Sequence, residues 1–333
     1  MRPACLELLR CPSCRHVPLE LQAEVWGAQE VREGTLRCAA CEETFPIAGG
    51  VVEMLREPSE QAQEEIASID SWLPAVNELT PLNDDWLIGL PNTFHKGAQT
   101  DIALNLPRLL ELIDPRPGQR VLEVGAGTTW LSNVLAARGC FVVATDITRR
   151  LYVGLDSADV LMRHSGTVYD RIQAEMNDIP CVDASFDLIV ANAVFHHSEN
   201  LLETLTEMHR LLRPGGMIYV HVPNYASLTI HLGVSRFAYN EPLGHLNYFT
   251  PRTLAAMLRR AGFTRVRLHS DHLEYQDFVH REPFDYGTFE AGLATAGGRQ
   301  TGGRLWAAAR SLLNVPLDLF KCGTYLWGFA QRA

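Results

Sequence analysis

From about residue 93 onward, the chain alternates between two hydrophobic patterns. Short, nearly continuous apolar runs predict buried strands, and amphipathic stretches between them predict helices. The predicted strands are Arg120–Val124, Cys140–Thr145, Val168–Ala174, Phe186–Ala191, Met217–Val222, Thr264–His269 and Thr324–Gln331. The predicted helices run from the first strand to Arg138 and over Arg149–Arg163, Leu201–Leu212 and Pro251–Ala261. This alternation predicts an α/β fold, with a Rossmann-like sheet of seven strands and helices on both faces.

The pattern before residue 93 is different and suggests two further regions. Residues 1–56 are rich in cysteine and contain short strand-like runs. Residues 57–92 contain four prolines and read as an acidic linker, with a helix expected over Ser59–Asp70. We therefore expect a small N-terminal unit at 1–56, a linker at 57–92 and a larger domain at 93–333. Long connections predict insertions in that domain at about 223–249 and 276–321.

Charge is unevenly distributed along the 333 residues, which carry 29 Lys and Arg against 39 Asp and Glu. Residues 1–56 have a net charge of −2, and residues 57–95 hold eight acidic and no basic residues. This balance argues against nucleic acid as the main partner. No apolar run is long enough for a signal peptide or a membrane-spanning helix. Because the cysteines are also not arranged as a disulfide framework, we expect a cytoplasmic protein with no transmembrane segment.

Four of the eight cysteines form two pairs, Cys11-Pro-Ser-Cys14 and Cys38-Ala-Ala-Cys41, with 23 residues between them. Each CxxC turn can present two thiolates to one metal ion, and two such turns complete a tetrahedron. Four thiolates leave no open position, so the pattern predicts structural zinc. The alternatives are four unrelated buried cysteines or a redox pair, but neither pair lies at a strand-to-helix turn as a redox motif would.

A glycine-rich turn follows the first predicted strand and contains Glu123, Gly125 and Gly127. Such turns let the backbone approach a ligand closely. A dinucleotide site requires a third glycine where this chain has Trp130, which argues against NAD or FAD. S-adenosylmethionine (SAM) carries a sulfonium and an ammonium group, which suit carboxylates. Asp146 ends the second strand, where it can accept hydrogen bonds from both ribose hydroxyls or, alternatively, simply cap a turn.

Several stretches between about residues 120 and 225 resemble class I SAM-dependent methyltransferases, and look most like the group that methylates small molecules, quinones and sugars. They are the glycine turn, Glu175-Met-Asn-Asp-Ile-Pro180, Ser185–Val190, Ala191–His197 and Leu211–Gly216. The chain departs from the family's glycine pattern at Thr129, which replaces the last glycine. The resemblance implies cofactor contacts from Glu123, Gly125, Ala126, Gly127, Thr128, Asp146, Ile147, Glu175, Met176 and Asn192.

Catalytic side chains are harder to select, because methyl transfer needs a base only when the acceptor must lose a proton. His197, at the tip of the fourth predicted strand, is the first candidate and His245 the second. Each histidine has an alternative reading as a purely structural residue. The aromatic residues of the 223–249 insertion suit a covered, mostly apolar acceptor pocket.

The N-terminal unit resembles the zinc ribbons that act as activator subunits of tRNA and release-factor methyltransferases. The similarity rests on Leu9–Pro12, Leu36–Cys38, Phe45–Ile47 and Gly50–Leu55 and covers about 50 residues. It implies a ribbon that stabilises a methyltransferase or binds a protein partner. Because residues 1–56 contain little apolar material, we expect the ribbon to unfold without metal. The domain at 96–333 is expected to keep its cofactor site.

The sequence as a whole predicts a SAM-dependent methyltransferase that acts on a small-molecule, sugar or lipid-linked acceptor. Two alternatives remain open. One is an RNA methyltransferase with an N-terminal zinc module. The other is a non-catalytic scaffold in which the methyltransferase-like domain is degenerate. The replacement of a glycine by Thr129 favours this hypothesis, and the retained Glu123 and Asp146 argue against it.

Overall fold

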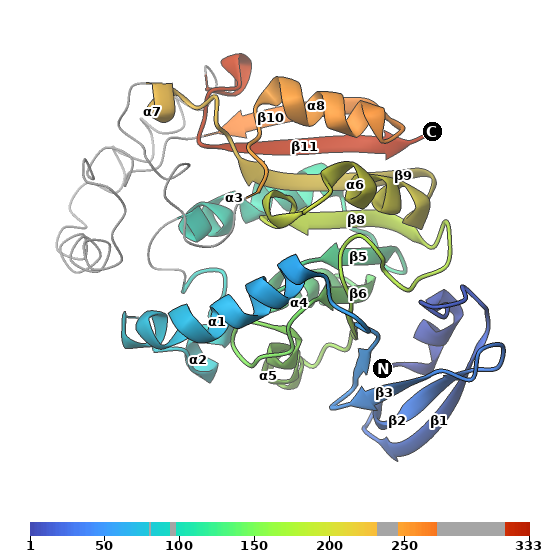
Figure 1. Cartoon of the computed structure of the whole chain (residues 1–333). Coiled ribbons are helices and arrows are strands. Elements are labelled where there is room, and N and C mark those ends of the chain that lie inside the picture. Colours follow the sequence, from blue (N-terminus) through green and yellow to red (C-terminus); the bar gives the residue numbers. More distant parts are fainter. Residues whose placement is uncertain (80, 94–97, 232–245, 272–316) are drawn as a thin grey trace.

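The computed structural model describes residues 1–79, 81–93, 98–231, 246–271 and 317–333. In this part of the chain, eleven strands form one mixed sheet in the order β1-β2-β3-β4-β7-β6-β5-β8-β9-β11-β10 (Figure 1). The strands are β1 (Leu19–Trp26), β2 (Val31–Cys38), β3 (Thr44–Ala48), β4 (Val51–Glu53), β5 (Arg120–Val124), β6 (Phe141–Asp146), β7 (Asp170–Gln173), β8 (Phe186–Asn192), β9 (Leu212–Pro223), β10 (Phe263–Asp271) and β11 (Tyr325–Arg332).

Helices cover both faces of the sheet. They are α1 (Glu60–Leu79), α2 (Asp84–Ile88), α3 (Ala98–Ile113), α4 (Trp130–Ala136), α5 (Ala158–Ser165), α6 (Leu201–Leu211), α7 (Leu228–His231) and α8 (Pro251–Arg260). Short 3-10 turns are η1 (Pro3–Leu8), η2 (Leu155–Ser157) and η3 (Phe195–His197). Buried residues of α6 and α8 belong to one apolar cluster, and those of α3, α4 and α5 belong to the other.

The seven strands β5 to β11 confirm the predicted α/β sheet. β7, β6, β5, β8 and β9 run parallel, as expected when helices connect successive strands. The last strand, β11, inserts between β9 and β10 and pairs antiparallel with both. All parallel strands therefore end at the same edge of the sheet, which is where open α/β sheets bind ligands.

The N-terminal ribbon continues this sheet instead of standing apart from it. β4 pairs in parallel with β7, with Val52 opposite Ile172. Apolar ribbon residues such as Leu36 and Phe45 belong to the same buried cluster as Leu122 of β5. The eleven strands are thus the seven of the methyltransferase-like sheet and four of the ribbon, and the ribbon covers what would otherwise be an open sheet edge.

Buried ion pairs cross the same junction, here called the seam and defined by Glu30, Arg32, Asp159 and Arg171. Arg171 is fully buried, and its Nη2 lies 2.7 Å from Glu30 Oε2 while its Nη1 lies 2.5 Å from Asp159 Oδ1. Arg32 contacts the same two carboxylates, at 2.8 and 2.5 Å. Glu30 and Arg32 belong to the ribbon, whereas Asp159 and Arg171 lie on α5 and β7. Every carboxylate of the seam therefore has two arginine partners.

Two predicted helices differ from those observed. The helix expected over Arg149–Arg163 is a series of turns up to η2, and α5 begins only at Ala158. The Arg149 side chain donates to Glu53 and to the Ala48 carbonyl, so this segment is held against the ribbon. The helix expected over Ser59–Asp70 is longer and reaches Leu79 despite Pro74.

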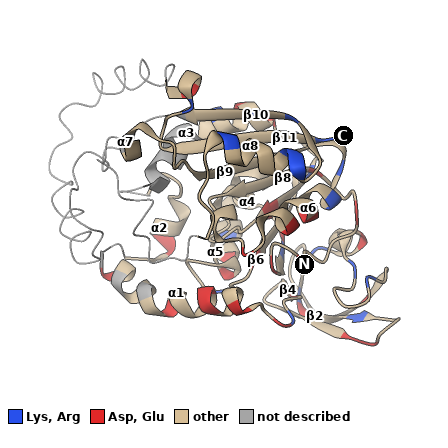
Figure 2. Cartoon of the chain, turned by 45° about the horizontal axis from the view of Figure 1, so that its top comes forward, with Lys and Arg blue, Asp and Glu red and all other residues tan. Residues whose placement is uncertain are grey.

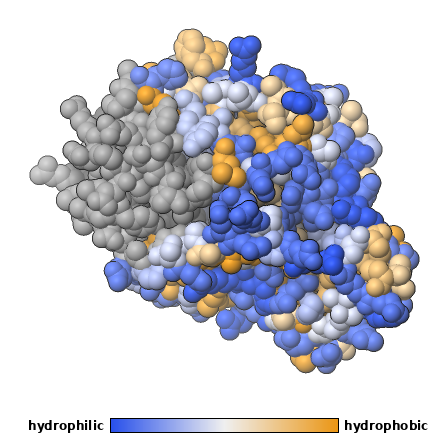
Figure 3. Space-filling view, in the orientation of Figure 1, coloured by the Kyte–Doolittle hydropathy of each residue, from blue (hydrophilic) through white to orange (hydrophobic). Residues whose placement is uncertain are grey.

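Among the described residues, no helix is both long and apolar enough to cross a membrane. The face drawn in Figure 3 is largely hydrophilic over its described part, with small apolar patches.

Candidate cofactor and metal sites

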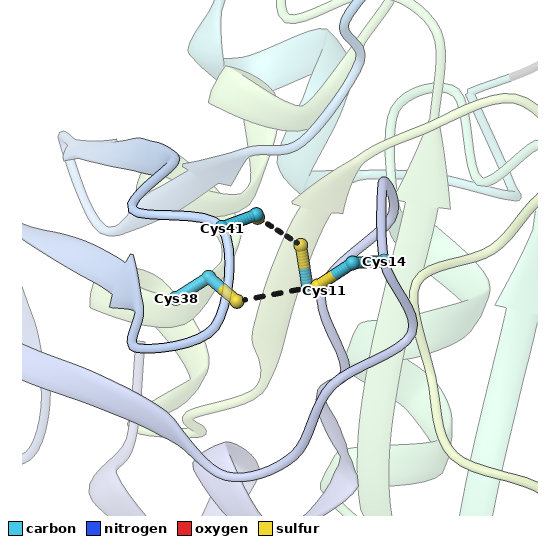
Figure 4. A group of neighbouring side chains, drawn as sticks. All are labelled: Cys11, Cys14, Cys38 and Cys41. Carbon is cyan, nitrogen blue, oxygen red and sulfur yellow. Dashed lines mark hydrogen bonds between the residues drawn. The ribbon is translucent and has the colours of Figure 1, made fainter.

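The four paired cysteines converge at one end of the ribbon. Their sulfur atoms all lie within 4.8 Å of one another, and Figure 4 shows the side chains facing each other from two loops. Cys11 Sγ is 3.6 Å from Cys41 Sγ, and Cys14 Sγ is 3.5 Å from Cys38 Sγ. Tetrahedral zinc with Zn–S bonds of ~2.3 Å places sulfurs ~3.8 Å apart. The donor set and its spacing therefore fit structural zinc.

The two CxxC turns share a backbone shape, and backbone N–H groups of the second turn contact the Cys38 thiol. Both turns end in a left-handed residue, Arg15 with φ 62° and Glu42 with φ 64°. Burial would raise the pKa of the Cys38 thiol, but hydrogen bonds from the backbone N–H groups of Cys41 and Ala40 and with the neighbouring thiols lower it to about 6, whereas burial and hydrogen bonds among the thiols raise the pKa of Cys41 to about 12. A lowered pKa favours the deprotonated form that binds metal.

The predicted cofactor residues meet at the carboxyl edge of the sheet. Register places Val124 opposite both Thr145 of β6 and Ala191 of β8. The next residues along each strand, Gly125, Asp146 and Asn192, are therefore neighbours at this edge. Glu175 follows β7, which pairs with β6. The structure thus brings together residues that lie up to 69 positions apart in the chain.

The glycine turn has the shape that close ligand approach requires. Gly125 and Gly127 have φ of +62° and +48°, a region that favours glycine. A Cβ on Gly125 would lie 2.3 Å from a methyl carbon of Val194. Thr129, the departure from the glycine pattern, also has φ 62°, and its hydroxyl lies 2.9 Å from that of the buried Tyr169. The substitution is therefore accommodated by a specific contact.

Two carboxylates border this turn. Asp146 accepts hydrogen bonds from the backbone N–H of Gly127 at 2.8 Å and of Thr148 at 2.9 Å. Burial nevertheless raises its pKa to about 6. Glu123 is buried at the end of β5 and accepts from the Ser132 hydroxyl, yet burial raises its pKa to about 8. Within the described part of the chain, neither carboxylate forms an ion pair with a Lys or Arg that would stabilise it as an anion.

A third carboxylate, Glu65 of α1, was not found from the sequence. Burial raises the pKa of Glu65 to about 7, with a further contribution from the charge of Asp146. Its Oε1 lies 3.9 Å from His197 Nδ1. We call Glu65, Glu123 and Asp146 the carboxylate edge. Among the described residues, no Lys or Arg forms an ion pair with any of the three. The expected linker thus contributes directly to the site.

The helix that carries Glu65 is held to the same edge at two points. The backbone N–H of Ser59 donates to Glu175 Oε1 at 2.6 Å, just before α1 begins. Further along α1, Asp70 forms an ion pair with Arg150, which lies four residues after Asp146. Glu175, expected to contact adenine, therefore also positions the start of α1.

The remaining predicted residues lie close by. Ile147 is half-buried, and its carbonyl accepts from Gln173 Nε2 at 2.9 Å. Met176 packs on the apolar cluster beneath the edge. Asn192 Oδ1 is buried and receives no hydrogen bond within the described part of the chain. Ala126 donates its N–H to the Thr145 carbonyl at 2.9 Å, which holds the glycine turn against β6.

Of the two histidine candidates, only His197 lies among the described residues. His197 lies in η3, directly after β8, and its side chain is 15% exposed. Its ring lies 4.2 Å from that of His196. His245 lies outside the described residues, as do most of the two predicted insertions.

A family model described as "Methyltransferase domain" matches residues 94–268, more than half of the chain. The chain belongs to the methyltransferase domain family. A second model, described as "Trm112p-like protein", matches residues 2–50, which confirms the predicted ribbon. The cofactor classes of this chain are accordingly SAM and structural zinc, and the donor groups described above fit both.

Relatives agree on the family but span only part of each chain. The ubiquinone biosynthesis O-methyltransferase of Xylella fastidiosa is 31% identical over 177 residues, which cover 51% of this chain and 68% of that protein. A malonyl-[acyl-carrier protein] O-methyltransferase of Erwinia billingiae is 29% identical over 161 residues, 45% of this chain. The chain spans only 61% of the length of that relative, and 41% to 64% of two others of the same name.

A solved structure supports the fold over a greater length. The [4+2]-cyclase SpnF matches with a TM-score of 0.51 at 16% identity, covering 84% of this chain and 98% of that one. That protein is named as a cyclase. The fold therefore does not by itself determine the reaction, which must be argued from the site.

Proposed function

We propose that this chain is a SAM-dependent methyltransferase that modifies a small-molecule, sugar or lipid-linked acceptor. The observation that carries the proposal is the carboxylate edge: three buried or half-buried carboxylates, beside a glycine turn, with no Lys or Arg paired to them among the described residues. A cationic ligand would stabilise their charged forms. SAM supplies that positive charge together with a transferable methyl group.

Several of the predicted residues then have a role in binding. Asp146 would accept hydrogen bonds from the ribose, and Glu123 would lie toward the ammonium of the methionine portion. Backbone N–H groups of the glycine turn and the Asn192 side chain would complete the contacts. The chain's own contribution to the reaction is alignment, since in-line displacement gains much of its rate from orientation.

Calorimetric titration of the full chain with SAM tests this proposal. Wild type should bind, and Asp146→Ala should weaken binding at least ~10-fold, because a charge-assisted hydrogen bond contributes ~1.5–3 kcal/mol. Unaltered affinity in this variant would contradict the ribose assignment. Failure of the wild type to bind SAM would favour the non-catalytic scaffold.

The acceptor class is argued from charge. α1, which lies at the carboxylate edge, contains five acidic and no basic residues, and Figure 2 shows this acidic helix. RNA binding draws much of its affinity from Lys and Arg that neutralise phosphates, so this edge is unsuited to a phosphate backbone. We therefore favour a small-molecule, sugar or lipid-linked acceptor over RNA.

Labelled SAM incubated with cell-extract fractions would identify the acceptor class. Label should enter small molecules or lipids. Transfer into RNA, together with salt-sensitive binding of bulk RNA at about 150 mM salt, would instead support the RNA alternative.

A further inference from the structure

Glu65, on α1, lies close to two of the other candidate site residues. It lies close enough to Asp146 for their charges to interact, and its Oε1 is 3.9 Å from Nδ1 of His197. Asp146 ends β6, and His197 follows β8 by five residues. Glu65 is therefore a neighbour of both Asp146, the residue proposed to hold the ribose, and His197, the candidate base.

The order of groups within SAM suggests which of them Glu65 would face. The sulfur joins the ribose to the methionine portion and carries the methyl group that is transferred. A carboxylate that neighbours both the ribose residue and the candidate base is well placed to face the sulfur. α1 carries Glu65 to this place: the hydrogen bond from Ser59 N–H to Glu175 holds the start of the helix, and the exposed Asp70–Arg150 ion pair is a second contact further along it.

We propose that Glu65 faces the sulfonium of SAM and makes the site prefer SAM over its product, S-adenosylhomocysteine. This inference rests on the proposed function of the site. The two ligands share the adenine, the ribose and the amino acid portion, so Asp146 and Glu123 act on both. They differ at sulfur, which is positive in SAM and neutral in the product. A carboxylate at sulfur therefore stabilises only SAM.

Glu65 should hold the product less strongly than SAM and so favour its release. Once the methyl group has left, the attraction between Glu65 and sulfur disappears, while the desolvation of Glu65 remains. Among the described residues, the titratable groups next to Glu65 are Asp146 and His197, and the ring of His196 lies against that of His197. The burial of Glu65 and the charge of Asp146 both disfavour an ionised Glu65 until a cation binds.

Calorimetry on the full chain with SAM and S-adenosylhomocysteine as separate ligands tests the proposal. Glu65→Gln should lower the affinity for SAM about tenfold and change the affinity for the product less than about twofold. Glu64→Gln is the matched control, because Glu64 is the adjacent, exposed acid on the same helix. It should leave both affinities unchanged.

A second measurement is the number of protons released when SAM binds. Titrations of SAM at pH 7 in phosphate and in Tris should reveal proton release by wild type, because the pKa of Glu65 is about 7 before the cation binds. Glu65→Gln should release fewer protons, and Glu65→Asp should retain part of the preference for SAM. Circular dichroism melts would verify that each variant is folded.

Three outcomes separate the possibilities. An equal loss of affinity for both ligands in Glu65→Gln would place Glu65 at a shared group and overturn the inference. Unchanged affinity for SAM would also overturn it. If wild type binds neither ligand, the proposed function itself fails, and that result is distinct from both of the others.

Discussion

The seam and the carboxylate edge are both built from buried or half-buried carboxylates, but burial has opposite outcomes for their pKa values. At the seam, burial alone would raise the pKa of Glu30 and Asp159, yet contacts with Arg171 and Arg32 outweigh it and lower both values. At the edge, the pKa values of Glu65, Glu123 and Asp146 are all raised.

This difference separates structural from binding roles. A buried carboxylate that already has its cation is part of the architecture, and removing the partner leaves an uncompensated charge. A buried carboxylate without a cation is unfavourable until a ligand supplies one. The seam therefore stabilises the attachment of the ribbon to the sheet, and the edge is suited to a positively charged cofactor.

Removal of zinc should have the largest effect on stability, because it unfolds the ribbon that the seam joins to the sheet. Cys38→Ser should lose the metal, and in isolated zinc peptides metal binding contributes ~10–16 kcal/mol to folding. Because ribbon residues share a buried cluster with β5 and β8, we expect SAM binding to be lost in the same unfolding transition. Denaturation followed by circular dichroism and by SAM binding would measure this.

This prediction revises the expectation from sequence that the domain at 96–333 keeps its cofactor site without zinc. Cys322→Ser is the control, since Cys322 is outside the metal cluster. Independent unfolding of the ribbon, with SAM affinity retained, would restore the original expectation.

Breaking the seam by substitution should have the next largest effect. Arg171→Met removes the shared partner of Glu30 and Asp159 and should cost ~3–5 kcal/mol in the free energy of unfolding. Arg138→Met, at an exposed helix end, should change it by less than ~0.5 kcal/mol. Urea denaturation compares the two variants. A cost below ~1 kcal/mol for Arg171→Met would show that the pairing strands alone hold the ribbon.

The sequence predicted the parts of this comparison that depend on local pattern. The strands, the glycine turn and the cysteine cluster each lie within a few residues or follow a recognisable spacing. The seam does not, because Glu30 and Arg171 are 141 residues apart and neither has a distinctive neighbourhood. Glu65 was missed for a related reason: an acidic, proline-containing stretch is typical of a linker, and only its packing on the sheet edge makes it part of a site.

The pH dependence of stability should separate the two carboxylate groups. Raised pKa values at the edge mean that the folded state without cofactor holds protons that the unfolded state has released. The free energy of unfolding should therefore fall as pH rises from about 4.5 to about 8, the range set by Glu65, Glu123 and Asp146. The seam has lowered pKa values, so its contribution is lost only as pH falls below the ordinary carboxylate range.

Urea denaturation between pH 5 and pH 8.5, with and without SAM, would measure this dependence. Saturating SAM should reduce the slope, and Glu123→Gln should reduce it in the absence of SAM. A free energy of unfolding that rises steadily across this interval in the absence of SAM would contradict the assignment of raised pKa values to the edge.

The smallest effect is expected from the exposed ion pair between α1 and the loop after β6. Asp70 and Arg150 have side-chain exposures of 64% and 49%, so water screens their attraction, and such pairs contribute ~0–1 kcal/mol. Asp70→Asn should change the free energy of unfolding within that range and SAM affinity less than about twofold, because Glu175 still holds the start of α1 at Ser59. Hydrogen exchange of α1 amides would detect any loosening. A loss of SAM affinity comparable to that of Glu65→Gln would mean that α1 is positioned mainly by this pair, and that the placement of Glu65 depends on it.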